Sequence, residues 1–172
     1  MNITMKKKLI VTSLLAASVF ASAANAGTFN ITGKITATDC VASAEVAGIK
    51  MPEINLNDLG RTAGNFAATD TDITIKLTGC PAIQKTAIVT FTGTEDTTNP
   101  KALKLNGVEG IALALFEKDG TKEIEINKAA VDQPLDGSVE HKLKYKVKYV
   151  TTSTVFKPGD ATASLDFAVA YN

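Results

Sequence analysis

The stretch that decides the fold is residues 142–149, KLKYKVKY. Leucine, tyrosine and valine occupy the odd positions, and lysine occupies every even position. Strict alternation of this kind is typical of a β-strand with one face on a core and the other in water. The sequence therefore predicts a strand over these residues, with its lysines exposed.

The same period recurs in four other stretches, at 29–37, 72–77, 87–92 and 163–171. Between two further apolar runs, 111–116 and 123–126, the pair Asp119-Gly120 predicts a hairpin turn. Apolar residues at helical spacing are not evident. Short strands separated by turn residues favour a single all-β domain, a β-sandwich.

The first 26 residues have the pattern of an export signal. Three lysines at 6–8 precede an apolar run to about residue 24, and Ala24-Asn25-Ala26 has the small residues of a cleavage site. Cleavage there would leave 146 of the 172 residues, beginning at Gly27. The apolar run is too short for a good membrane anchor and no second one follows, so we expect no direct membrane anchoring.

The charge of the exported part argues against nucleic acid as a partner. Without the three signal lysines, 15 basic and 18 acidic residues remain, a net charge of −3. A mildly acidic domain lacks the positive surface that binds nucleic acid or an anionic membrane.

Cys40 and Cys80 are the two cysteines of the chain. In an exported protein such a pair predicts one structural disulfide. Each cysteine is one residue out of phase with the apolar residues of its strand, so we expect the bond to join neighbouring strand ends. Two thiols forty positions apart, with one histidine in the chain, do not make a four-ligand metal site, and no metal or other cofactor is expected.

No pattern in the sequence indicates a catalytic site. The single histidine, His141, opens the lysine-rich strand, and no G-x-S-x-G motif supplies a nucleophile. Glu123 and Glu125 alternate with Ile124 and Ile126, which places both carboxylates on a solvent face. These features favour a structural or binding protein over an enzyme.

Several spacings together resemble the pilin subunits of chaperone–usher fimbriae, of the type 1 and P-pilus kind. Gly33 lies seven residues before Cys40, and the second cysteine follows forty residues later. Residues 110–116, GIALALF, are similar to a central strand of those subunits. Gly159 is fourteenth from the end, an alternating strand follows it, and Tyr171 is the penultimate residue.

The resemblance implies an immunoglobulin-like β-sandwich that lacks its final strand. In such subunits a groove stays open beside the C-terminal strand, a periplasmic chaperone fills it temporarily, and the N-terminal extension of the next subunit then replaces the chaperone. The implied division is a signal peptide at 1–26, a donor-strand extension with the first strand at 27–39, and the sandwich at 40–172.

Site residues follow from the same resemblance. The donor face would consist of Phe29, Ile31, Gly33 and Ile35. The groove and its C-terminal strand would consist of Gly159, Ala163, Leu165, Phe167, Val169 and Tyr171.

The implied function is that of a structural subunit of an adhesive surface fimbria, exported through the periplasm. Its partners would be a periplasmic pilus chaperone, an outer-membrane usher, and further copies of itself or sibling pilins. The alternative is a self-contained secreted β-sandwich that binds a partner and does not polymerise.

Overall fold

Nine strands and one helical turn form the part of the chain that the structure, a computed structural model, describes, residues 32–83 and 85–172. Residues 36–172 make one compact unit, and the described residues 32–35 belong to a separate one. The elements are β1 (Val41–Ala44), α1 (Leu56–Leu59), β2 (Thr71–Thr78), β3 (Lys85–Gly93), β4 (Leu103–Lys104), β5 (Ile111–Glu117), β6 (Glu123–Ile124), β7 (Gln133–Leu135), β8 (His141–Thr151) and β9 (Leu165–Tyr171).

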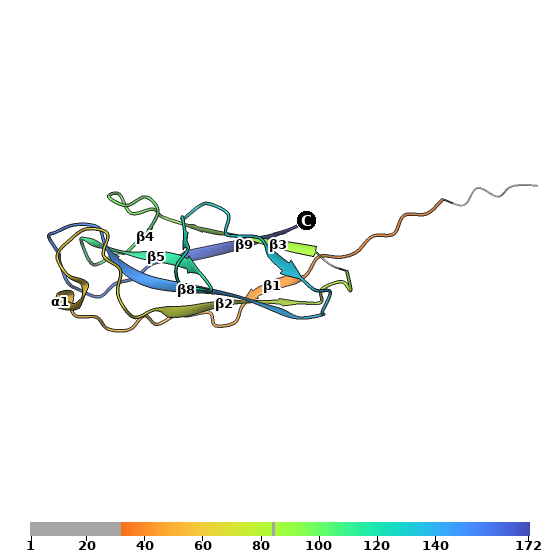
Figure 1. The fold of residues 1–172 in the computed structure, drawn as a ribbon, viewed down its shortest axis with the longest axis horizontal. Helices are drawn as coiled ribbons and strands as arrows, with labels where there is room; N and C mark the ends of the chain where they lie inside the picture. The colour runs from red at the N-terminus through yellow and green to blue at the C-terminus, as the bar shows by residue number, and fades with distance from the viewer. Residues whose placement is uncertain (1–31, 84) are drawn as a thin grey trace, which may run out of the picture. The chain divides into compact units, whose positions relative to one another are not determined.

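The strands form two antiparallel sheets. The larger has the order β1-β2-β8-β5-β4, with β6 also paired to β5, and the smaller has the order β7-β3-β9. The sheets lie in two layers, with β3 and β9 over β8 and β5 (Figure 1). The prediction of an all-β sandwich is confirmed.

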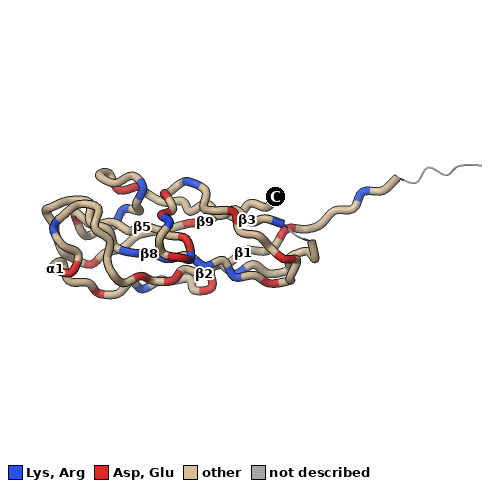
Figure 2. The backbone as a smooth tube through the Cα atoms, in the orientation of Figure 1, with Lys and Arg blue, Asp and Glu red and all other residues tan. Residues whose placement is uncertain are grey.

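β8 occupies the centre of the larger sheet, between β2 and β5. Its odd residues Leu143, Tyr145 and Val147 are buried, as the alternation predicted. Its lysines lie on the outer face, where the ammonium of Lys146 contacts the carboxylates of Asp70 at 2.9 Å and Asp72 at 3.2 Å. Basic and acidic residues are interspersed along this part of the fold (Figure 2).

The main core fills the space between the sheets. The rings of Phe91 on β3 and Tyr145 on β8 pack edge to face, with centroids 4.9 Å apart. Burial of each large apolar side chain contributes about 1.5–3 kcal/mol to folding, so this layer supplies most of the stabilisation.

β5 is buried on both faces along its whole length. One face joins the main core, and the other forms a second cluster that includes Ala114 and Phe116. Phe66 covers this cluster, with its ring 5.2 Å from that of Phe116. Both faces of β5 are covered, which is why the run 110–116 is apolar at nearly every position.

The structure differs from the sequence prediction at both ends. A strand was predicted over 29–37, but residues 32–40 form none, and the first strand begins at Val41. A strand needs a neighbour for its backbone groups, and alternation alone does not supply one. The last strand begins at Leu165 rather than 163, because Thr162 pairs instead with Asn106. The turn α1 was not anticipated.

Candidate functional site

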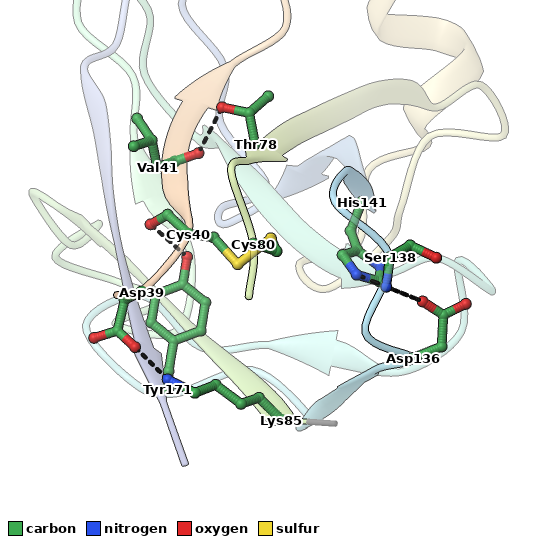
Figure 3. The surroundings of a disulfide bond; sticks show 10 residues. All are labelled: Asp39, Cys40, Val41, Thr78, Cys80, Lys85, Asp136, Ser138, His141 and Tyr171. Atoms are coloured by element: carbon green, nitrogen blue, oxygen red, sulfur yellow. Dashed lines mark hydrogen bonds and ion pairs between the residues drawn. A yellow bond between two sulfur atoms is a disulfide. The ribbon is translucent and has the colours of Figure 1, made fainter. Parts of the chain in front are cut away.

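The disulfide joins the ends of two neighbouring strands. Cys40 directly precedes β1 and Cys80 follows β2, and their Cα atoms lie 4.3 Å apart (Figure 3). The first pair of the β1–β2 register is Val41 with Thr78. The predicted disulfide, and its position at strand ends, are confirmed.

β9 lies at the edge of the smaller sheet and, within the described residues, pairs only with β3. Asn172 and Thr86 exchange both backbone hydrogen bonds at 3.0 Å. Hydrogen-bonded pairs alternate along an antiparallel ladder, so the even residues of β9 bond to β3. The amide and carbonyl groups of the odd residues therefore point to the open edge: Leu165, Phe167, Val169 and Tyr171.

The side chains of the same odd residues point inward but are only half-buried. On the neighbouring strand β3, the inward residues Ala87, Val89 and Phe91 are at most 1% exposed. Both strands belong to one sheet, so the difference shows that the interior is covered over β3 and uncovered beside β9.

An apolar cavity of about 670 Å³ occupies the uncovered region. One wall is formed by the start of β9 and the residues before it, including Ala163, Leu165 and Phe167. The opposite wall is the segment after β1, and the floor is the core between the sheets. The large apolar residues of that wall are Val46, Ile49, Met51, Ile54 and Leu56, and the charged residues Glu45, Lys50 and Glu53 of the same segment also line the cavity.

Four of the six residues expected along the groove line this cavity: Gly159, Ala163, Leu165 and Phe167. Val169 and Tyr171 continue along β9 beyond it. Gly159 also meets a packing requirement, since a Cβ there would lie 2.6 Å from the carbonyl oxygen of Gly107. Backbone hydrogen bonds between Asn106 and Thr162 and between Glu109 and Lys157 hold the segment before β9 against the 106–109 loop.

The residues expected to form the donor face lie only partly in the described region. Phe29 and Ile31 fall outside it. The side chain of Ile35 is fully exposed, and a Cβ added to Gly33 would meet no atom within 4 Å. Their role as a donor face stays a prediction.

The wall opposite β9 was missed by the sequence analysis. Its apolar residues follow neither the period of a strand nor that of a helix, because this segment forms no strand and only one helical turn. The beginning of the wall is bound to β2 by the hydrogen bond from the Glu45 amide to the Thr74 carbonyl oxygen, at 2.9 Å, and an ion pair connects Glu45 to Lys142 on β8. The hydrogen bond from Lys142 lowers the pKa of the Glu45 carboxyl.

His141 begins β8, with its Nε2 atom 3.6 Å from a carboxylate oxygen of Asp136. Hydrogen bonds from Ser138 lower the pKa of Asp136, and His141 adds a smaller effect. Among residues 32–83 and 85–172, no three His, Cys, Asp or Glu side chains gather closely enough to hold a metal ion. In the same residues, no helix has the length and apolar character needed to cross a membrane.

The model of the family described as fimbrial protein matches residues 29–172. The chain belongs to the fimbrial protein family. It is 31% identical to the uncharacterized fimbrial-like protein YcbU of Escherichia coli K12, over 77% of the chain and 76% of the relative. It is 28% identical to the F17 fimbrial protein of Escherichia coli, over 96% of the chain and 98% of the relative.

Solved structures of pilus proteins share the fold of this fimbrial protein. An antigen and type I fimbria protein of Burkholderia pseudomallei is 29% identical, with a TM-score of 0.60, covering 84% of the chain and 97% of that structure. The P pilus rod subunit PapA is 18% identical, with a TM-score of 0.65, covering 78% and 100%. The sandwich is thus the immunoglobulin-like fold of pilins.

Proposed function

We propose that this chain is a structural subunit of an adhesive surface fimbria, assembled by donor-strand exchange. In this assembly the N-terminal segment of one subunit occupies the groove beside β9 of the next. The observation that carries the proposal is the apolar groove itself, bordered by a strand with unpaired backbone groups. Membership of the fimbrial protein family supports a structural role.

The groove and the N-terminal segment have complementary chemistry. A strand laid beside β9 would satisfy the amide and carbonyl groups of its four odd residues. The same strand would place its alternate side chains on the apolar floor. Burying Phe29, Ile31 and Ile35 would contribute about 4–9 kcal/mol at roughly 1.5–3 kcal/mol each, before the cost of ordering the segment.

The open edge would also make a chaperone and an usher necessary for assembly. An apolar groove beside an unpaired strand invites aggregation. A periplasmic chaperone would cover the groove until an outer-membrane usher brings two subunits together. The chain would then pass through the periplasm and end in a fimbria on the cell surface.

Deletion of residues 27–36 tests the proposal. The shortened chain keeps the groove but lacks the donor segment, so it should accept a neighbour and offer nothing to the next. Added in excess to full chain, it should shorten the fibres, as measured by electron microscopy. A full-length chain in which the same residues are replaced by a Gly/Ser segment should shorten the fibres equally, because it too lacks the donor side chains; this separates the loss of those side chains from the loss of chain length.

Fibres of unchanged length in the presence of the deletion variant would contradict the proposal. So would a full chain that runs as a clean monomer in gel filtration without any chaperone, because an unfilled groove should cause self-association.

A further inference from the structure

A small group of contacts surrounds the point at which the N-terminal segment leaves the sandwich. The carboxylate of Asp39 lies 2.5 Å from the ammonium of Lys85, and the hydroxyl of Tyr171 donates to the carbonyl oxygen of Cys40 at 3.2 Å. The Lys85 ammonium also lies 5.8 Å from the centre of the Tyr171 ring. We call Asp39, Cys40, Lys85 and Tyr171 the root cluster (Figure 3).

The root cluster connects residues 39–40 to the smaller sheet. Lys85 is the first residue of β3 and Tyr171 is the last residue of β9. The disulfide separately connects Cys40 to Cys80, beside the larger sheet. Cys40 is therefore held from both layers of the sandwich, whereas the side chains of residues 32–39 are exposed.

The environment of the ion pair makes it more than an ordinary surface contact. The side chain of Lys85 is 19% exposed, while that of Asp39 is 59% exposed. Fully exposed pairs contribute little because water screens them and both side chains lose freedom. Here the Lys85 ammonium also lies within cation–π range of the Tyr171 ring, so Asp39 pairs with a cation that has a second favourable contact.

We propose that Lys85 is a positioning residue that fixes where the free N-terminal segment begins. With Asp39 and Cys40 held on the end of the smaller sheet, the free part of the chain starts at Thr38. This inference rests on the proposed function, because a fixed start matters only if the segment enters a second subunit. A shorter free tether then makes each joint of the fibre stiffer.

The test compares full-chain variants by amide exchange at residues 36–42 and by the persistence length of their fibres in electron micrographs. Lys85→Gln and Asp39→Asn each remove the ion pair, and neither residue itself lines the cavity. We expect exchange at the amide of Val41, the first residue of β1, to rise by about fivefold, and the fibres to bend more readily. Fibre yield should stay unchanged.

Rescue variants separate this role from a general effect on folding. Lys85→Arg should keep wild-type exchange and stiffness. The exchanged pair Asp39→Lys with Lys85→Asp should recover only part of both, because it restores the ion pair without a cation over the Tyr171 ring. Lys104→Gln, a change at an exposed lysine on β4, is the matched control. Exchange that rises by less than about twofold in both single variants would overturn the inference. A loss of fibre yield with unchanged exchange would also overturn it, since Lys85 would then act on the groove.

The two proposals fail separately. If the wild-type chain forms no fibres, the proposed function fails, while exchange in the soluble chain still shows whether Lys85 holds residues 39–40. If fibres form but their stiffness does not depend on the ion pair, only the positioning role is wrong.

Discussion

At the scale of single residues, the environment shifts the pKa values of two identical side chains, Glu123 and Glu125, in opposite directions. Both alternate with the buried residues Ile124 and Ile126, as the sequence predicted. Burial raises the pKa of the Glu123 carboxyl, with Lys101 opposing and Glu125 adding to the rise. Hydrogen bonds from Lys128 and Lys101 lower the pKa of Glu125.

Because the pKa values of Glu123 and Glu125 shift in opposite directions, we expect their mutations to have opposite effects on stability. Folded Glu123 holds its proton more tightly than in the unfolded chain, so the folded state loses stability as pH rises through the interval above the ordinary pKa of 4.5. Glu123→Gln should therefore raise the melting temperature slightly near neutral pH and change it little near pH ~3. Glu125→Gln should lower the melting temperature near neutral pH, because stabilisation by ionised Glu125 is lost. The melting temperatures are measured by calorimetry. A change in the same direction for both variants near neutral pH would contradict this assignment.

The disulfide is the residue-scale contribution that should matter most to stability. Replacing Cys40 and Cys80 together by serine removes a cross-link spanning 40 positions. In the chain-entropy model the loss is about 4 kcal/mol of unfolding free energy. Denaturant titration of the chaperone-bound or fibre-derived chain measures it. A loss below about 1 kcal/mol would mean that the reduced, unfolded chain is already constrained near these residues.

At the scale of elements, the sequence predicted the strands that carry an alternating pattern or a continuous apolar run, and it missed β1, β4 and β7. β8 has lysines outside and apolar residues inside, so its position and orientation followed from alternation. β1, β4 and β7 have two to four residues each, too few for a period to be recognised. The pairing of β9 with β3 determines which edge of the sandwich is open. No local sequence pattern predicts that pairing.

Because adjacent residues of β9 lie on opposite faces, we expect mutations at Asp166 and Phe167 to differ sharply in their effect on assembly. Phe167 lines the groove, whereas Asp166 is exposed on the other face. Phe167→Asp puts a charge on the β9 wall of the groove and should abolish capture by the chaperone and acceptance of a neighbour. Asp166→Asn should leave both unchanged. Fibre yield and copurification with the chaperone are the measurements.

A mixing experiment controls for misfolding of the Phe167→Asp chain. That variant keeps its donor segment, and the 27–36 deletion keeps its groove, so an equimolar mixture should form heterodimers and nothing longer. Normal fibres from the Phe167→Asp chain alone would show that the groove does not receive the partner.

At the scale of the whole molecule, the chain combines a sandwich that has an open edge with a preceding segment, residues 32–39, that is exposed and forms no strand. The alternation at 29–37 predicted a strand, and residues 32–40 form none in the isolated chain. The sequence can show that a segment is suited to pair, but not which molecule supplies its partner. The expectation that a neighbouring subunit is the partner came from the resemblance to pilins and not from periodicity.

The most direct measurement of the central claim is disulfide cross-linking between subunits. Ala168 is exposed on β9, and Asn30, Thr32 and Lys34 would share the outward face of a donor strand beside it. Chains carrying Ala168→Cys together with a cysteine at one of these three positions are assembled, oxidised and separated by electrophoresis. Lys104→Cys, on β4 of the other sheet, replaces Ala168→Cys in the control.

The account predicts a ladder of covalent multimers for at least one Ala168→Cys pair and none for the Lys104→Cys control. If fibres form and every Ala168→Cys pair stays monomeric under oxidation, the N-terminal segment does not lie beside β9, and the central claim is wrong.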